Sequence, residues 1–447
     1  MAAPAPRKIN IAIIGGGIGG LALVLAIQHF CDLDQLEVNV YESAAQISQI
    51  GAGINVWERV YDILTELGME AEFATHLREG ETSFTCRKSD QPEGVTFREV
   101  SLDQSGKMLL MHRADVQDIF LKYISPDVKM HLSHRLESYS YNDAAAQRIE
   151  LKFRGGQKAQ CDLLIAADGV HSAVRQVFLP RLAKKLDKPE LLESLDPIFS
   201  GSRVFRGLVP AEELSNVWPN HPALTKPHQY CGLDKHIVTY PVSRGRFVNV
   251  VPFYTDYSQE DTPFTGSYIG SATNEELLQE YDGWEPEVMT LLKCIPTPSH
   301  WSVLTMKPFD IWADEGVMLL GDAAHAMTPH LGAGAGQAIE DAYILARVLG
   351  HVQKKGPLEM LSDETMKLYN RLRPPIANFV QARAKLQTRF YEFREEDVDL
   401  SLVQADSPIY TESDRLAKLG AGIWDGFHWS QHSIVRKTDA EVANLLS

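Results

Sequence analysis

The sequence predicts an α/β protein in which a doubly wound domain carries an inserted, mostly β-stranded domain and a C-terminal helical segment. Three observations support this fold class. A strand-like run enters a glycine-rich turn at residues 8–20, an apolar run enters a second small-residue turn at residues 319–334, and strand-like segments replace helix–strand alternation between 186 and 302. A chain of 447 residues is also too long for one ordinary core.

The first element is a β-branched strand from Lys8 to Ile14, which is followed by a glycine-rich turn and an apolar helix from Leu21 to Phe30. Gly15, Gly17 and Gly20 have the spacing of the dinucleotide-binding fingerprint of Rossmann-type domains. The first glycine permits the tight turn, the second lets the backbone approach a pyrophosphate, and the third lets helix and strand pack closely.

A second strand, Leu36 to Tyr41, ends at Glu42, which stands 22 residues beyond Gly20. A carboxylate at this position can accept both ribose hydroxyls of an adenosine. These features predict bound NAD or FAD. FAD is favoured because a small-residue stretch, Gly51 to Ile54, and an amphipathic helix closed by Gly68 follow, whereas a simple dehydrogenase is expected to continue into another βαβ unit.

The second turn follows an apolar strand that ends at Leu319-Leu320 and precedes a helix predicted to begin around Gly334. Asp322 is expected at the carboxyl end of the strand, the edge where open α/β sheets bind ligands. The small residues leave room for a large ligand beside the backbone, and the helix N-terminus offers free N–H groups. A glycine-rich loop that only packs tightly is the alternative.

Composition narrows the function. Hydrophobic residues make up 44% and charged residues 23% of the chain, as in a soluble globular protein. The net charge of −16 argues against nucleic acid or an anionic membrane as a partner. The five cysteines form no CxxC pair and the N-terminus resembles no signal peptide, so we expect a cytoplasmic protein. Five glycines interrupt the apolar segment from Ile11 to Ile27, which argues against a membrane span.

Three further segments join the fingerprint. They are Asp168 to Arg175 directly after the apolar strand Leu163 to Ala166, the sequence His112-Arg113-x-Asp115, and Gly321-Asp322 with Pro329. Together they resemble the FAD-dependent aromatic hydroxylases, which are single-component flavoprotein monooxygenases. The wording of residues 321–342 and 236–251 is most similar to the salicylate hydroxylase-like branch, and the resemblance covers residues 8 to about 385.

The resemblance implies an FAD-binding domain in two parts, residues 1–185 and 303–385, with a short excursion into the substrate domain near residues 84–106. Residues 186–302 form the mostly β-sheet substrate domain. Residues 386–447, which include Trp424, Phe427 and Trp429, are expected to form a helical and aromatic cap that docks on the FAD domain or forms a dimer contact. Monomer and homodimer both remain open.

The resemblance also implies cofactor contacts. The three fingerprint glycines hold the pyrophosphate, Glu42 the adenosine ribose, and Arg113 the phosphate or ribitol region. Asp322 hydrogen-bonds a hydroxyl of the sugar or ribitol chain, and Asp168 touches FAD and the path of the nicotinamide.

The backbone from Pro329 onward is implied to lie along the flavin ring. Its contact residues are Gly332, Ala333, Gly334 and Ala335. Arg175 is expected to brace the turn with Asp168. Gln337 stands where many relatives carry asparagine, which leaves the helix contact to the flavin open.

The implied chemistry is that of the family: NADH or NADPH reduces FAD, oxygen adds to give a flavin hydroperoxide, and an electron-rich phenolate ring attacks it. The expected function is therefore hydroxylation of a small aromatic acid of the salicylate or 4-hydroxybenzoate type, with loss of CO2 if the attacked carbon carries the carboxylate. No metal-ligand spacing or hydrolase motif occurs, so we expect no metal.

Four residues are candidates for contact with the substrate or the reacting centre. Arg206 can hold a carboxylate or phenolate, His236 and Tyr240 share one strand face and can orient or deprotonate a phenol, and Pro329 opens the flavin loop. Alternatively, Arg206 is a surface strand arginine and His236 a satisfied core histidine. Because Tyr240 precedes Pro241, we expect it at a strand end or edge.

Two histidines of the second turn stay ambiguous between a base and a structural role. For His325 we favour an imidazole bonded to the backbone, and His330 beside Pro329 is left open. Two other functions compete with the aromatic hydroxylase. One is an FAD monooxygenase or oxidoreductase acting on a nonaromatic or secondary-metabolite substrate, and the other is a flavin-bound scaffold without turnover.

Overall fold

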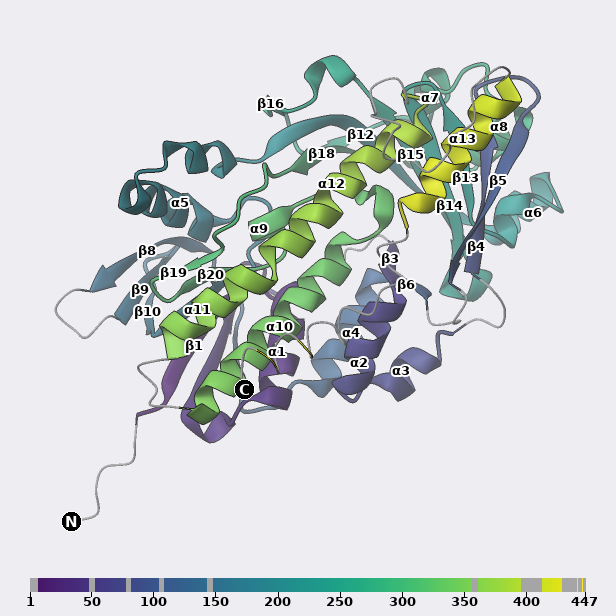
Figure 1. The fold of residues 1–447 in the computed structure, drawn as a ribbon. Helices are drawn as coiled ribbons and strands as arrows, with labels where there is room; N and C mark the ends of the chain where they lie inside the picture. Colours follow the sequence, from purple (N-terminus) through teal and green to yellow (C-terminus); the bar gives the residue numbers. More distant parts are fainter. Residues whose placement is uncertain are drawn as a thin grey trace, which may run out of the picture.

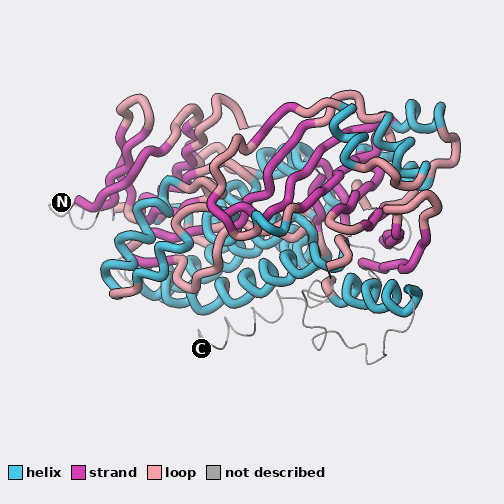
Figure 2. Tube along the Cα trace, turned by 90° about the horizontal axis from the view of Figure 1, so that it is seen from above, coloured by secondary structure: helices cyan, strands magenta, loops and turns pink. Residues whose placement is uncertain are grey.

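The computed structural model describes residues 7–47, 53–77, 82–103, 108–142, 148–355, 361–394, 412–427, 440 and 444. The described chain forms two large sheets and two small ones, with long helices beside them (Figure 1). In the view of Figure 2 the long helices run along one side of the molecule and most strands lie on the other. Gly51, Ala52 and Trp429 fall outside the described residues.

The first sheet has six strands in the order β19-β20-β11-β1-β2-β7 and is parallel except for the β19–β20 pair. Its strands are β1 (Ile9–Ile14), β2 (Leu36–Tyr41), β7 (Lys129–His131), β11 (Leu163–Ala166), β19 (Ala313–Asp314) and β20 (Val317–Leu319). The predicted strands before both small-residue turns and before Asp168 are confirmed. Because the parallel strands end at one edge, these turns meet there.

Helix α1 (Ile18–Phe30) packs against α10 (Gly334–Lys355), so the two helices that follow the two turns lie side by side. Both predicted helices are confirmed, although α1 begins three residues earlier than expected, with Gly17 as its N-cap. The other helices around this sheet and its turns are α2 (Glu58–Glu66), α3 (Glu70–Ala74), α4 (Arg113–Tyr123), α5 (Ala173–Leu186), α9 (Asp322–His325), α11 (Leu361–Leu372) and α12 (Pro374–Tyr391).

The larger sheet runs β17-β18-β12-β15-β14-β13-β4-β5, with β16 paired to β12. Its strands are β4 (Thr82–Lys88), β5 (Val95–Asp103), β12 (Ile198–Pro210), β13 (His228–Gly232), β14 (Lys235–Val242), β15 (Phe247–Thr255), β16 (Thr262–Pro263), β17 (Ile269–Ser271) and β18 (Ser299–Thr305). Three further helices follow its strands: α6 (Ala211–Val217), α7 (Asn274–Glu280) and α8 (Pro286–Lys293). Thus β4 and β5, from the first quarter of the chain, belong to the sheet otherwise built by residues 198–305.

Two smaller sheets complete the described structure. They are the three-stranded sheet of β8 (Leu136–Asn142), β9 (Arg148–Phe153) and β10 (Lys158–Cys161), and the pair of β3 (Gly53–Val56) and β6 (Leu109–His112). Helix α13 (Glu412–Asp425) packs against α12 and against β5 of the larger sheet (Figure 1). Among the described residues no helix combines the length and apolar content that crossing a bilayer requires.

A buried carboxylate on α10 fixes the second turn. Asp341 accepts hydrogen bonds from the backbone N–H of Gly321 (2.9 Å), from Nε2 of His325 (2.7 Å) and from Nε of Arg373 (2.7 Å). Burial alone would raise its pKa, but the charges of His325 and Arg373 outweigh burial and lower the pKa of Asp341 to about 2. Asp341 is therefore ionised and ties the turn to α10 and α12.

This arrangement corrects the expectation for His325, whose imidazole was predicted to bond the backbone. Its Nε2 bonds the Asp341 carboxylate instead, and its ring lies 5.1 Å from the ring of Trp312. His325 is fully buried and does not line the cavity described below, so its role is structural. Gln337 also belongs to this buried network, because its Oε1 accepts from Nη2 of Arg373 at 2.8 Å.

Replacing Asp341 with asparagine is expected to lower the free energy of unfolding by about 3–5 kcal/mol, because Arg373 then loses a fully buried ionic partner. Denaturant titration of the purified variant measures this loss. The matched control is Asp314→Asn, which removes a partly exposed pair with Lys185 and should cost less than about 1 kcal/mol. Equal losses in the two variants would contradict a special role for Asp341.

Candidate active site

A cavity of about 540 Å³ lies between the carboxyl edge of the six-stranded sheet and one face of the larger sheet. One wall is formed by the two small-residue turns, including Gly17 and residues 326–335, and it is bare of large side chains at Gly17 and from Gly332 to Ala335. The opposite wall consists of side chains from β12, β14, β15 and β18. The two walls differ in chemistry. The first offers backbone N–H groups and open space, and the second offers apolar and aromatic side chains and the guanidinium of Arg206.

The first turn needs glycine for two distinct reasons. At Gly15 (φ +108°) and Gly20 an added Cβ would lie 2.2 Å from the carbonyl oxygen of Ala167 and 2.0 Å from that of Gly15, respectively. These two positions serve backbone packing. At Gly17 the nearest atom to an added Cβ is Nη2 of Arg113, 3.9 Å away, so this glycine leaves its backbone open to the cavity beside a guanidinium.

The carboxylate of Glu42 contacts the backbone of the first turn. One oxygen of its carboxylate accepts the backbone N–H of Gly16 at 2.8 Å, and the other accepts that of Ala44 at 2.7 Å. The carboxylate therefore stands at the end of β2 beside the glycine turn, outside the residues that line the cavity.

In the second turn, Asp322 and Pro329 are both exposed and line the cavity. Gly332 has left-handed backbone (φ +58°), and a Cβ there would lie 2.2 Å from Nδ2 of Asn55. Its carbonyl accepts Nε1–H of Trp57 at 3.2 Å. Residues 332–335 line the cavity up to the start of α10, so this stretch presents backbone and methyl groups only.

As predicted, Asp168 and Arg175 hold the turn between β11 and α5 in place. Oδ2 of Asp168 accepts the backbone N–H groups of Ala173 (2.8 Å) and Val174 (3.3 Å) at the start of α5. Arg175 is buried and donates to the carbonyl groups of Val170, Leu195 and Ala323. Burial raises the pKa of the Asp168 carboxyl. Asp168 itself does not line the cavity, but its neighbours Gly169 and Val170 do.

Arg206, on β12, lines the side-chain wall of the cavity. Its guanidinium lies 4.7 Å from the ring centroid of Trp301, and its Nε has no hydrogen-bond partner. No acidic side chain in the described part of the chain forms an ion pair with Arg206. Burial lowers the pKa of this guanidinium. Arg206 is thus an uncompensated cation in a largely enclosed space.

Tyr240 lines the cavity beside Gly53, where an added Cβ would lie 1.8 Å from the tyrosine hydroxyl. Burial raises the pKa of Tyr240 to about 12, so its hydroxyl stays protonated near neutral pH. Strand β14 is interior, between β13 and β15, rather than at an edge. Pro241 is tolerated because its pairing with β13 has already ended at Thr239.

The remaining cavity wall is mainly apolar and aromatic, and sequence reasoning missed most of it. Its members include Phe84, Leu110, Val204, Val238, Asn249, Val251, Phe253, Tyr268, Trp301, Val303, Tyr391 and Phe427. The two-residue period of a strand could have identified some of them, because alternate residues of β12, β14 and β15 face the cavity together with Arg206 and Tyr240. This period could not have identified Phe427, which follows the end of α13.

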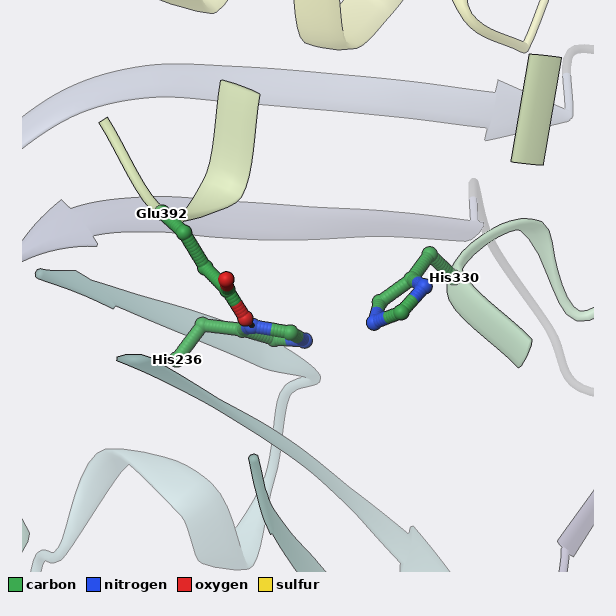
Figure 3. Close-up of side chains that lie close together, drawn as sticks. All are labelled: His236, His330 and Glu392. Carbon is green, nitrogen blue, oxygen red and sulfur yellow. Dashed lines mark hydrogen bonds and ion pairs between the residues drawn. The ribbon is translucent and has the colours of Figure 1, made fainter. Parts of the chain in front are cut away.

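His330 lines the cavity, whereas His236 lies behind it, which corrects the expectation that His236 contacts a substrate directly. The His236 ring stacks on Phe253 at 4.5 Å and lies 4.9 Å from the His330 ring. Its Nδ1 is 2.8 Å from Oε1 of Glu392. Figure 3 shows the three side chains converging from three elements. The sequence analysis did not predict this cluster, because its three residues are far apart in the chain.

Comparisons with known proteins agree with this geometry. The family model described as an FAD binding domain matches residues 8–185 and 230–383. A salicylate hydroxylase of Pseudomonas putida is 32% identical over 399 residues, covering 87% of this chain and 86% of that protein. A 6-methylsalicylate 1-monooxygenase of Aspergillus terreus is 28% identical, covering 88% and 85%. The solved structure of a salicylate hydroxylase substrate complex superposes with a TM-score of 0.74 at 25% identity, covering 95% of this chain and 98% of that one.

Replacing Gly20 with alanine is expected to lower the flavin content of the purified protein severely, because the new methyl group must displace the Gly15 carbonyl and with it the first turn. The absorbance ratio of flavin to protein measures this. Gly270→Ala is the control, since the nearest atom to its new methyl group, Nδ1 of His300, is 3.6 Å away. Undiminished flavin content in Gly20→Ala would contradict the packing argument.

Proposed function

Because this chain belongs to the FAD-binding-domain family and is an FAD-dependent aromatic hydroxylase, we propose that it hydroxylates a phenolic acid held between Arg206 and the 329–335 loop. The observation that carries the substrate class is the uncompensated guanidinium of Arg206 on a cavity wall that is otherwise mainly apolar and aromatic. An aromatic carboxylate matches both properties, since its ring suits the wall and its charge suits the cation.

The cavity fits FAD as the cofactor. Gly17 and residues 332–335 form a cradle in which side chains larger than a methyl group are absent, and Arg113 stands beside the first turn. In the proposed arrangement the backbone of the fingerprint glycines and Arg113 hold the pyrophosphate, Glu42 the adenosine ribose, Asp322 a ribitol hydroxyl, and the 329–335 backbone the flavin ring. Bound FAD takes electrons from NAD(P)H and activates O2 for transfer to the ring.

The protein's own contribution is to orient the ring and to keep water away. The carboxylate pairs with Arg206, which fixes one end of the substrate, while Trp301 and the valines of β12, β14 and β15 hold the ring plane. The Tyr240 hydroxyl is neutral and can donate to a phenolate oxygen, which favours the ionised and more electron-rich ring. Pro329 begins the backbone stretch that would hold the flavin ring.

We further propose an ortho-hydroxybenzoate such as salicylate as the substrate type, because the relatives named above are a salicylate hydroxylase and a 6-methylsalicylate 1-monooxygenase. With the carboxylate drawn toward Arg206, either the carbon that bears it or a neighbouring ring carbon can face the flavin. Attack at the former expels CO2 and attack at the latter retains the carboxylate.

The deciding experiment is NAD(P)H oxidation by the FAD-loaded protein with salicylate, 4-hydroxybenzoate, other hydroxybenzoates and simple phenols, followed by mass spectrometry of the products. A product that gains oxygen and loses CO2 supports the decarboxylating reaction. A product that gains oxygen alone supports plain hydroxylation. Phenol turned over better than every acid would contradict the role given to Arg206, and no oxygenated product from any compound would contradict the phenolic-acid proposal.

Replacing Arg206 with alanine is expected to raise the apparent KM for the aromatic acid by about one to two orders of magnitude, for loss of one charge-assisted pair. Steady-state kinetics with varied acid measure the change. Arg203→Ala is the matched control, since Arg203 is on the same strand but lies over Phe199, outside the cavity wall. An unchanged KM in Arg206→Ala would remove this residue from the site.

Replacing Asp322 with alanine is expected to weaken FAD retention, because a carboxylate exposed to the cavity at the end of β20 then no longer accepts a cofactor hydroxyl. Dialysis followed by fluorescence of the released flavin measures the loss. Asp310→Ala, outside the cavity, is the control. Full flavin occupancy of Asp322→Ala after dialysis would refute the contact.

A further inference from the structure

The side-chain wall of the cavity runs across six adjacent strands of the larger sheet, β18-β12-β15-β14-β13-β4. Each of these strands contributes at least one lining residue, from Trp301 on β18 through Arg206 on β12 to Phe84 on β4. Arg206 and Phe84 are four strand spacings of about 4.8 Å apart, so their backbones are separated by roughly 19 Å. This wall is longer than a single aromatic ring, and the place where it ends therefore decides which ring substituents fit.

The wall ends where the C-terminal helix docks. No described residue of β5, the strand beyond β4, lines the cavity, and α13 packs against β5. The residue that stands at this end is Phe427, which follows α13 and is 6% exposed. Phe427 lines the cavity, and its ring meets the ring of Phe84 edge-on with centroids 5.7 Å apart. Phe427 thus closes the side-chain wall beside β4.

Close contacts between α13 and α12 fix the position of Phe427. At Gly422 an added Cβ would lie 2.5 Å from the ring of Phe390, so α13 approaches α12 more closely than a larger residue would allow. Nη2 of Arg383 on α12 also forms an ion pair of 2.6 Å with Oδ2 of Asp425, the last residue of α13. These contacts hold the chain two residues before Phe427 and thereby place its ring.

Phe427 also stands close to the loop that is proposed to hold the flavin. Its ring lies 5.6 Å from the ring of Trp57, whose Nε1–H donates to the carbonyl of Gly332 at 3.2 Å. A substrate ring held between this loop and the larger sheet therefore has Phe427 beside it on the β4 side. Helix α13 lies after residue 383, the last residue that the family model matches, so the matched domain does not supply this closure.

We propose that Phe427 is a specificity-determining residue, which sets the upper size limit for substituents that extend from the substrate ring toward β4. This inference rests on the proposed phenolic-acid hydroxylase. The neighbouring lining side chain, Phe84, is also apolar, so the substituents admitted here are apolar. The substrate is then a hydroxybenzoate with at most a short apolar group on this side, and contact with Phe427 excludes a longer chain or a second fused ring.

The test is a ratio of two values of kcat/KM, that for a substituted salicylate divided by that for salicylate, measured with the FAD-loaded full chain. The substituted compounds carry an ethyl group at carbon 3, 4, 5 or 6 of the ring in turn, and 1-hydroxy-2-naphthoate carries a fused second ring. Such a ratio does not depend on the fraction of the protein that is folded, so partial misfolding of a variant leaves it unchanged.

In Phe427→Ala the ratio should rise about 10-fold for compounds whose substituent points toward β4, because two more carbons can then be buried. Phe427→Trp should lower the same ratios and leave kcat/KM for salicylate nearly unchanged. The matched control is Phe379→Ala, which removes a phenylalanine of α12 that is 55% exposed and lies outside the cavity. Its ratios should equal those of the unchanged protein.

The outcomes are distinct. If the unchanged protein turns over neither salicylate nor any substituted salicylate, the phenolic-acid function and this inference fall together. If it turns them over and no ratio changes in either Phe427 variant, only the inference fails. An equal loss with all compounds in Phe427→Ala, together with a lower flavin content, would also overturn it, because Phe427 would then act through Trp57 on the flavin loop.

Discussion

The buried carboxylate of Asp341 is the interaction on which the rest of the site depends. It holds the backbone of Gly321, the ring of His325 and the guanidinium of Arg373 at once, and thereby joins the end of β20 to α10 and α12. A loop of small residues has few side-chain contacts of its own to fix its path. Because Asp341 supplies that fixation from α10, the stretch from Gly332 to Ala335 can meet the cavity with backbone and methyl groups alone.

The two walls of the cavity suit different ligands. The bare wall suits a large planar cofactor that needs backbone contacts and close approach. The side-chain wall, which comes from a different sheet, supplies a single cation at Arg206 and a neutral hydroxyl at Tyr240 within an apolar surround. In such a surround each polar contact counts for more than it would in water. A charged aromatic substrate can therefore be placed by few groups.

Sequence reasoning captured what local patterns determine. The glycine spacing and the strands before each turn identified the fold, and the motifs at residues 112–115, 168–175 and 321–329 identified the FAD family. Arg206 and Tyr240, which were singled out for possible contact with a substrate, both line the cavity. Sequence reasoning could not capture contacts made by the tertiary fold alone. Glu392 is 156 residues from His236, and no periodicity links them. The prediction for His325 was also wrong. Its partner Asp341 comes 16 residues later in the chain, after the loop and within α10.

The central claim is that the cavity brings a phenolic acid to FAD for insertion of one oxygen atom. The most direct measurement is turnover of salicylate by the FAD-loaded protein under ¹⁸O₂ with NAD(P)H, with mass spectrometry of the product. The account predicts one labelled oxygen in each product molecule and consumption of one NAD(P)H for each. Product oxygen that comes from water, or NAD(P)H consumed with hydrogen peroxide as the sole product, would contradict it.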